Sequence, residues 1–373
     1  MEFGVGEDRA EKPDAAPLRR GWTTGACATA ATRAALTALL TGDFPDPVEI
    51  ILPKGETPAF VLNRTALAAD QAMASIVKDA GDDPDVTHLA EIVATLRFGE
   101  PGTGVRFHAG PGVGMVTLPG LPLPPGEPAI NPVPRRMMTD VVEALCAAHG
   151  RAPDVTIEIA VTNGAELARH TWNPRLGIVG GLSILGTTGI VHPFSCSAWI
   201  HSIHRGVDVA RAAGLEHVVG ATGSSSEAAA RARYPELPEI AYLDMGDFAG
   251  GLLKYMRQHP VERLTIAGGF AKLTKLAQGA MDLHSGRSQV DFTALHVLVA
   301  GLDPDAGARL REAVLGANTA KAVLDLTQAA GLDLGAIVAA QARAQALAQL
   351  RGTPVAVEVL VVDREGRVIA HAG

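Results

Sequence analysis

Apolar and polar residues alternate over several short segments in the first half of the chain, and this period of two predicts β-strands. A helix precedes them, because Thr23-Thr24-Gly25 leads into the alanine-rich residues 26–40, with Thr24 as the expected N-cap. Seven prolines exclude regular structure over residues 119–134, and a second helix is expected over 136–149. The strands are expected at residues 48–52, 72–78, 89–98, 105–108 and 155–161.

In the second half, short apolar runs alternate with longer amphipathic stretches, which predicts strands alternating with helices. The strands are expected at residues 217–219, 240–243 and 264–267, and the helices at 200–213, from Glu227, from Phe248 and after Gly268-Gly269. This order favours a mostly parallel, doubly wound sheet. Two alanine- and leucine-rich helices are expected near residues 306–330 and 334–350, followed by a hairpin of residues 355–362 and 368–370.

Together these patterns predict a mixed fold with α+β and α/β parts. An N-terminal α+β domain with mostly antiparallel strands precedes a doubly wound α/β domain. The expected bounds are a flexible tail over residues 1–16, an α+β domain with substrate loops over 17–165, and an α/β domain with glycine-rich ligand loops over 166–373. A length of 373 residues, 47% of them hydrophobic, is enough for two cores.

Charge and cysteine content narrow the function classes. A net charge of −8 argues against nucleic-acid binding and means that an anionic ligand needs local cations. The charged N-terminus lacks an apolar signal region, and no run approaches the roughly 20 apolar residues of a membrane helix. The three cysteines form no CxxC pair, and no histidine motif indicates a metal site, so a cytoplasmic protein with reduced thiols is expected.

The glycine-rich residues 173–191 are the first candidate for ligand binding. Glycine allows left-handed backbone angles and close approach, so such a segment can point several N–H groups at one anion. The alternative is a pair of tight turns. A second loop, residues 221–226, follows a predicted strand and opens a helix, where a helix N-terminus can bind an anion or simply be capped. Neither loop matches GxxxxGK[ST] or GxGxxG.

Two further segments carry charged side chains at close spacing. Residues 78–88 hold four carboxylates, one lysine and one histidine, and like charges this close should raise the pKa of at least one carboxyl group, which suits proton transfer. A solvated turn is the alternative. In residues 126–136, prolines fix an extended backbone that ends in Arg135 and Arg136. These arginines could bind carboxylates, or they could lie on the surface at the start of a helix.

These segments together resemble the CbiD family of corrin-ring biosynthesis, cobalt-precorrin-5B C1-methyltransferases. The resemblance covers residues 18–291 and rests on several motifs in a fixed order. They are Arg20-Gly21-Trp22-Thr23-Thr24-Gly25-Ala26-Cys27, residues 78–88, 110–120, 126–135 and 173–191, Lys272-Leu273-Thr274-Lys275-Leu276-Ala277, and His284-Ser285. Gly269-Phe270-Ala271-Lys272 and Ser224-Ser225-Ser226 differ from the pattern of many members.

The resemblance implies methylation of a ring carbon of a corrin precursor by S-adenosyl-L-methionine. On the residues of this chain, an acid or base is expected among Asp79, Asp82, Asp83 and His88. The cofactor is expected at Gly180, Gly181, Ser183, Gly186, Thr187, Thr188, Thr222 and Gly223. The acidic substrate is expected at Lys78, Arg135, Arg136, Arg175, Lys272 and Lys275, with no metal ligand.

The chain leaves several alternatives open. The substrate could carry cobalt or be the metal-free precorrin, and the chain could instead be a carrier of a corrinoid intermediate without catalysis. Which loop binds the cofactor and which the substrate is not fixed by the residues. The expected partner is a small corrin precursor, with no nucleic acid and no membrane, and the alanine-rich helices could form a homodimer interface.

Overall fold

The computed structural model describes residues 18–373, so the tail expected over residues 1–16 lies outside the described part of the chain. The chain divides into two compact units. The first unit comprises the described residues up to Arg106, with Val133–Ile157 and Leu185–Ser195. The second unit comprises Phe107–Pro132, Glu158–Ile184 and Cys196–Gly373. The domain boundary expected after residue 165 stays a prediction.

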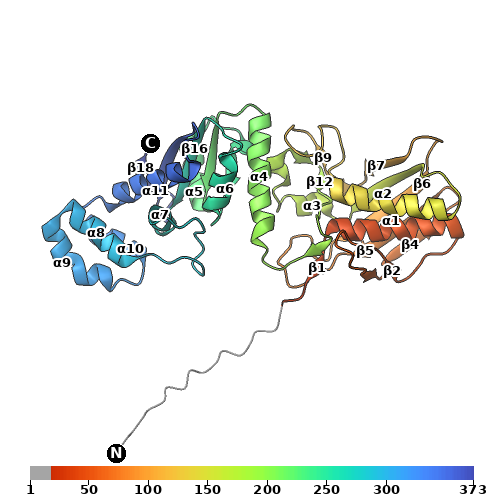
Figure 1. Cartoon of the computed structure of the whole chain (residues 1–373), viewed down its shortest axis with the longest axis horizontal. Helices are drawn as coiled ribbons and strands as arrows, with labels where there is room; N and C mark the ends of the chain where they lie inside the picture. The colour runs from red at the N-terminus through yellow and green to blue at the C-terminus, as the bar shows by residue number, and fades with distance from the viewer. Residues whose placement is uncertain (1–17) are drawn as a thin grey trace, which may run out of the picture. The chain divides into compact units, whose positions relative to one another are not determined.

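The first unit holds β4, β5 and β6 of a five-stranded sheet of order β4-β5-β6-β10-β7, together with the first residues of β10 and β7, and α1 packs on β5 and β6 (Figure 1). The strands β4, β5 and β6 are antiparallel. The elements are β1 (Gly21–Trp22), α1 (Thr24–Thr41), β2 (Val48–Glu49), β3 (Ala59–Phe60), β4 (Arg64–Leu67), β5 (Gln71–Val77), β6 (Glu91–Phe98), β7 (Val105–Ala109), α2 (Pro132–Ala148), β10 (Val155–Val161) and β13 (Ile190–Val191).

The alanine-rich sequence of α1 explains how closely this helix lies on the sheet. Thirteen residues of α1 are buried, and they face the small buried residues of β5, among them Ala72 and Ala74. The N-cap is Thr23, whose hydroxyl accepts from the N–H of Ala26 at 3.2 Å, and not Thr24 as expected. The hydroxyl of Thr24 instead accepts a hydrogen bond from the N–H of Leu185 at 3.0 Å.

The second unit contains a five-stranded sheet of order β15-β14-β16-β17-β18, in which only β18 is antiparallel. Helices cover both faces, so the doubly wound α/β prediction is confirmed. The elements are β8 (Gly112–Val113), β9 (Met115–Val116), α3 (Gly164–Ala168), η1 (Asn173–Leu176), β11 (Ile178–Val179), β12 (Gly181–Leu182), α4 (Cys196–Ala212), β14 (His217–Ala221), α5 (Ser224–Arg233), η2 (Glu239–Ala241), β15 (Tyr242–Asp244), α6 (Ala249–Met256), β16 (Arg263–Gly269), α7 (Phe270–Ala277), α8 (Phe292–Leu302), α9 (Pro304–Leu315), α10 (Ala320–Ala329), α11 (Leu334–Leu350), β17 (Ala356–Val362) and β18 (Val368–Ala372).

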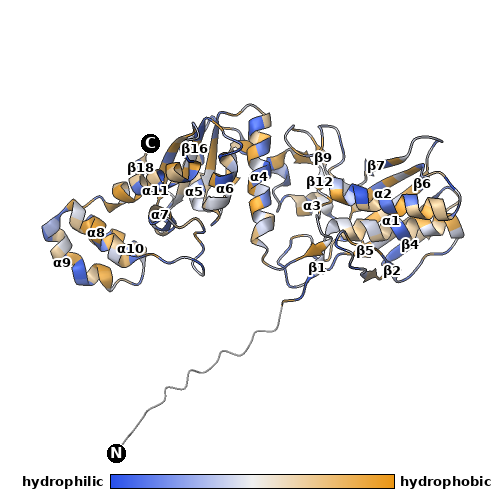
Figure 2. Cartoon of the chain, viewed as in Figure 1, coloured by the Kyte–Doolittle hydropathy of each residue, from blue (hydrophilic) through white to orange (hydrophobic). Residues whose placement is uncertain are grey.

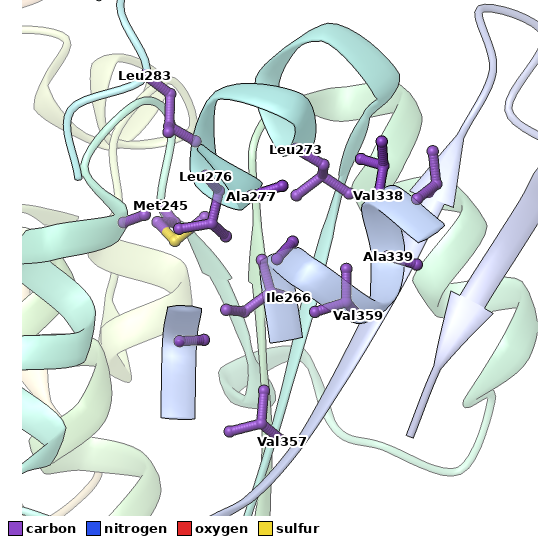
Figure 3. Packing of buried hydrophobic residues seen from close by; sticks show 14 of the residues in the cluster. Met245, Ile266, Leu273, Leu276, Ala277, Leu283, Val338, Ala339, Val357 and Val359 are labelled. Atoms are coloured by element: carbon purple, nitrogen blue, oxygen red, sulfur yellow. The ribbon is translucent and has the colours of Figure 1, made fainter. Parts of the chain in front are cut away.

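Alternate residues of each central strand enter different cores. Ile266 of β16 and Val359 of β17 pack with α7 and α11 on one face, as Figure 3 shows, whereas Ala267 and Leu360 pack beneath α5 on the other. Successive side chains of a strand point to opposite faces of the sheet, which explains this alternation. Because helices cover both faces, the sequences of these strands are continuously apolar.

The helices before the terminal hairpin differ from the prediction. The expected helix over residues 306–330 is two helices, α9 and α10, and α8 precedes them, coloured predominantly as hydrophobic in Figure 2. Capping explains the divisions: Asp291, Asp303 and Thr319 each accept hydrogen bonds from the first turn of the following helix. The helix α2 begins at Pro132, inside the proline-rich segment. Proline is tolerated there because the N–H groups of a helix's first turn have no partner within the helix, so the N–H that proline lacks is not missed.

Candidate functional site

A cavity of about 390 Å³ opens where the carboxyl ends of β14, β16 and β17 meet. From β14 the chain passes to β15 on one side and then to β16 on the other, so the connections diverge between β14 and β16. Ligands of open α/β sheets bind at such a point. The lining comprises residues 222–226, 269–272 and 362–364, with Lys321, Leu324 and Ile369.

Two helices begin at the cavity with glycine as the N-cap. They are α5 after Gly223 and α7 after Gly269. Neither glycine is demanded by packing, because a Cβ atom added at either position would meet nothing within 4 Å, and Gly269 has an ordinary φ of −67°. Helix N-termini present N–H groups and a positive dipole end, so two of them favour an anionic group. Glycine leaves room for that group to approach the backbone.

Cationic side chains add to this field. Lys272 donates to the carbonyl of Thr222 at 2.6 Å and lies 3.0 Å from Asp247 Oδ1, so it links the loops after β14, β15 and β16. Lys321 and Arg364 also line the cavity and are exposed. Among the cofactor and substrate residues predicted from the sequence, the cavity brings together Thr222, Gly223 and Lys272.

Two other predicted substrate residues are engaged within the second unit. Arg175 makes a bidentate pair with Glu227, with N–O distances of 2.8 and 2.9 Å. Lys275 is buried and donates to the carbonyl of Leu283 at 2.9 Å. Both contacts stabilise the fold, and they account for these cations without a ligand.

The glycine-rich residues 173–191 contribute to both units, and much of their glycine content meets a packing need. A Cβ atom at Gly181 would collide with the backbone of Gly112, and one at Gly186 with Thr23. Ser183 donates to Asn173 Oδ1 at 3.2 Å, and the hydroxyl of Thr188 accepts from the N–H of Ile190 at 3.2 Å. By contrast, Gly180 and Thr187 are exposed, and a Cβ atom at Gly180 would meet nothing. The cofactor role of this segment stays a proposal.

Each carboxylate within residues 78–88 has a defined partner in the first unit. Asp79 pairs with Arg19, whose hydrogen bond is the main cause that lowers the pKa of this carboxyl group. Asp82 accepts from the N–H of Arg19 at 2.6 Å, and Asp83 from the N–H of Phe194 at 2.7 Å. His88 is exposed, and its Nδ1 accepts from the N–H of Ala80 at 3.1 Å.

Lys78 is the most buried charged residue of this segment. Its side chain is 1% exposed, and Nζ lies 2.6 Å from Oδ2 of Asp85. Burial by itself would raise the pKa of Asp85, but the charge and hydrogen bond of Lys78, with two hydrogen bonds from Thr87, lower it overall. The pKa shifts of Asp79 and Asp85 are therefore opposite to the rise expected from crowded like charges.

Arg135 and Arg136 lie near the start of α2 in the first unit, half-buried and exposed respectively. The sequence did not single out Lys321, Arg364 or Asp244. Asp244 ends β15, and burial followed by the charge of Glu227 raises the pKa of its carboxyl group. Asp244 could have been found from the sequence as the acidic residue that ends the strand following a glycine-rich loop.

Among residues 18–373, no group of three or more His, Cys, Asp or Glu side chains is placed to hold a metal ion. No helix in the same residues is long and apolar enough to cross a membrane.

Comparison with known proteins identifies the family. Residues 11–193 match the family model described as CbiD, and residues 282–373 match the model described as CbiD, C-terminal domain. A protein of Brucella anthropi named cobalt-precorrin-5B C(1)-methyltransferase is 65% identical over 95% of this chain and 96% of its own length. One of the same name from Brucella abortus (strain S19) is 64% identical over 97% of both chains.

Among solved structures, the 1.9 Å crystal structure of the cobalamin biosynthesis protein cbiD from Archaeoglobus fulgidus is similar. It is 26% identical, with a TM-score of 0.40, and the match covers 72% of this chain and 83% of that one. The family models together match more than half of the chain, and the relatives match nearly all of it. This chain therefore belongs to the CbiD family.

Proposed function

We propose that this chain transfers a methyl group from S-adenosyl-L-methionine to ring carbon C1 of cobalt-precorrin-5B, giving cobalt-precorrin-6A in corrin biosynthesis. The observation that carries the proposal is 64–65% identity, over 95–97% of the chain, to proteins named for that reaction. The cavity at the edge of the parallel sheet supports it, because it offers a site for the methyl donor.

The cavity residues fit the methyl donor. A volume of about 390 Å³ lies within the usual range for small-molecule sites. The N–H groups that follow Gly223 and Gly269, together with Lys272, would hold the carboxylate of the donor. Gly180, Gly181, Ser183, Gly186, Thr187 and Thr188 remain proposed cofactor contacts, as do Lys78, Arg135, Arg136, Arg175 and Lys275 for the substrate.

The chemistry asks the protein mainly for positioning. The donor supplies a methyl group already activated on a sulfonium, so no protein nucleophile is required. The side chains must hold the ring carbon close to the methyl group and in line with the sulfur, and must exclude water. Fixed N–H groups and a lysine held by two neighbouring loops suit that role, because they need no rearrangement when the ligand arrives.

The direct test is turnover. Purified chain incubated anoxically with cobalt-precorrin-5B and S-adenosyl-L-methionine should release S-adenosylhomocysteine together with a corrinoid carrying one more methyl group at C1. Mass spectrometry and NMR would detect both. Turnover only with the metal-free precorrin would change the substrate, and tight binding of the corrinoid without S-adenosylhomocysteine would favour the carrier alternative.

The cavity assignment predicts a specific effect of Gly269→Ala. The new methyl group meets no protein atom, so the melting temperature should stay close to that of the wild type. The same methyl group would crowd a bound donor, and overpacking of about 1.4 kcal/mol corresponds to a tenfold rise in Kd. Calorimetry with S-adenosylhomocysteine measures it. The control is Gly301→Ala, another glycine with no atom within 4 Å, in α8. Equal Kd values for both variants would contradict the assignment.

The acid–base proposal concerns Asp79, Asp82, Asp83 and His88, one of which would accept a proton from the macrocycle. Asp79 is ion-paired with Arg19, whereas Asp82 and Asp83 each accept a hydrogen bond from a backbone N–H, which makes Asp82 and Asp83 the stronger candidates. The Asp82→Asn and Asp83→Asn variants are expected to reduce kcat by about 100-fold or more for the residue that serves as the base. Single-turnover rates measure this, and full turnover in both variants would remove these two carboxylates from the mechanism.

A further inference from the structure

Three large aromatic side chains form a row in the second unit. The ring centroids of Trp172 and Trp199 are 6.5 Å apart, and those of Trp199 and Phe248 are 6.3 Å apart. Trp199 is 42% exposed, and the other two are half-buried. Aromatic residues make up only 4% of the chain, so two of its three tryptophans side by side, one of them exposed, call for an explanation. We call these three residues the aromatic row.

The row is fixed in place by the end of the parallel sheet. Nε1 of Trp199 donates to the carbonyl of Asp244, the last residue of β15, at 3.0 Å. Gly246, with a φ of +56°, lies against the same indole ring, where a Cβ atom would stand 3.3 Å from it. A side chain that served only packing would be covered, whereas this indole is both held and exposed.

Cations lie at both ends of the row. The guanidinium of Arg175 is 5.8 Å from the ring centroid of Trp172, and that of Arg287 is 5.7 Å from the ring centroid of Phe248. Arg175 is engaged by two carboxylates, those of Glu227 and Glu239, whereas Arg287 is paired with Asp282. A guanidinium has five N–H donors, so Arg287, which pairs with Asp282 through Nε, can donate to a further carboxylate, whereas Arg175 already directs its donors to two glutamates.

A single contact links the chain at the row to the lining of the donor cavity. Asp247 precedes Phe248 in sequence, and its Oδ1 lies 3.0 Å from Nζ of Lys272, which lines the cavity. Two consecutive residues of one loop, Asp247 and Phe248, therefore contact a cavity-lining lysine and carry one ring of the row.

We propose that the aromatic row is the binding platform for the macrocycle, a flat conjugated ring bearing several carboxylates. The macrocycle stacks on the indole of Trp199, with Trp172 and Phe248 at its flanks, and Arg287 binds a carboxylate at its rim. The charges favour this occupant, because an aromatic face bordered by the guanidinium of Arg287 complements an apolar ring with an acidic rim. The inference rests on the proposed function, since that function supplies the macrocycle.

The test separates macrocycle binding from donor binding. With uroporphyrin as a stable polycarboxylate tetrapyrrole, Trp199→Leu and Arg287→Gln should each raise the Kd at least tenfold, and Arg287→Lys should recover part of the loss. The Kd of S-adenosylhomocysteine should stay within twofold of the wild type. The matched control is Phe98→Leu, in the first unit, because that ring also carries an arginine, Arg151, at 3.8 Å.

The outcomes distinguish this proposal from the proposed function. If the chain binds uroporphyrin through Trp199 but never transfers a methyl group, the platform stands and the methyltransferase function fails. If Trp199→Leu binds uroporphyrin as the wild type does, with an unchanged KM for cobalt-precorrin-5B, the platform is overturned while the function stands. Loss of binding in Phe98→Leu to the same extent would also overturn it.

Discussion

An Asp85→Asn variant is expected to lose about 3–5 kcal/mol of folding free energy, the range for breaking a buried ion pair by removing one partner. The reason is Lys78, which is 1% exposed and lies 2.6 Å from the Asp85 carboxylate. Without that carboxylate, a buried ammonium must be neutralised or remain without its counter-charge. Thermal and urea unfolding of the two proteins at neutral pH measure the difference.

The pH dependence follows from the pKa of Asp85. Because the folded-state pKa is lower than the ordinary value of 3.8, the carboxylate stabilises the fold fully above that value. The stabilisation is lost as the pH falls through the lowered pKa. Asp85→Asn should therefore lack this acid-dependent part of the unfolding curve.

Lys78→Met is the informative companion, because it replaces the buried ammonium with an apolar group and leaves Asp85 its two hydrogen bonds from Thr87. It should be clearly milder than Asp85→Asn. If the milder variant also keeps the substrate KM, Lys78 is a structural residue and its proposed substrate role falls. Equal stability of Asp85→Asn and the wild type would contradict the assignment of a buried ion pair.

Much of the fold could be predicted from local sequence. The period of two in β10 and the apolar runs of β16 and β17 identify these segments as strands. In the second unit, helices such as α5, α6 and α7 alternate with the strands along the chain, and this alternation predicts that neighbouring strands are parallel. The helices from α8 to α10 were harder, because their ends depend on single capping residues within a continuous alanine- and leucine-rich stretch. A cap such as Thr319, whose hydroxyl accepts from the N–H of Ala322, is one polar residue among several in that stretch.

The site could be predicted only in part, for two physical reasons. Glycine serves both ligand approach and close packing, and sequence does not distinguish Gly223, which faces open space, from Gly181, which lies against Gly112. Charge is equally ambiguous, because Arg175 is committed to Glu227 by tertiary contacts. Lys321 contributes to the cavity from a segment about a hundred residues away from the β14 loop, a proximity that no local pattern reveals.

The Lys272→Gln variant is expected to raise the Kd of S-adenosylhomocysteine about ten- to one-hundredfold, which corresponds to about 1.5–3 kcal/mol for a hydrogen bond to a charged group. Lys272 reaches the cavity and also holds the carbonyl of Thr222, so its loss removes a cation and loosens the loop after β14. Calorimetry and the rate of methyl transfer measure the effect. Lys254→Gln, an exposed lysine on α6, is the charge-matched control.

A second variant separates the two ways in which Lys272 could act. If Lys272 only neutralises Asp247, the double variant Lys272→Gln/Asp247→Asn removes both charges and should recover binding. If Lys272 binds the carboxylate of the donor, the double variant recovers stability and leaves the Kd high. The proposed cavity requires the second result, because helix N-termini alone supply a partial positive charge and the lysine supplies a full one. Recovery of binding would instead make Lys272 a structural residue and leave the donor to the N–H groups of α5 and α7.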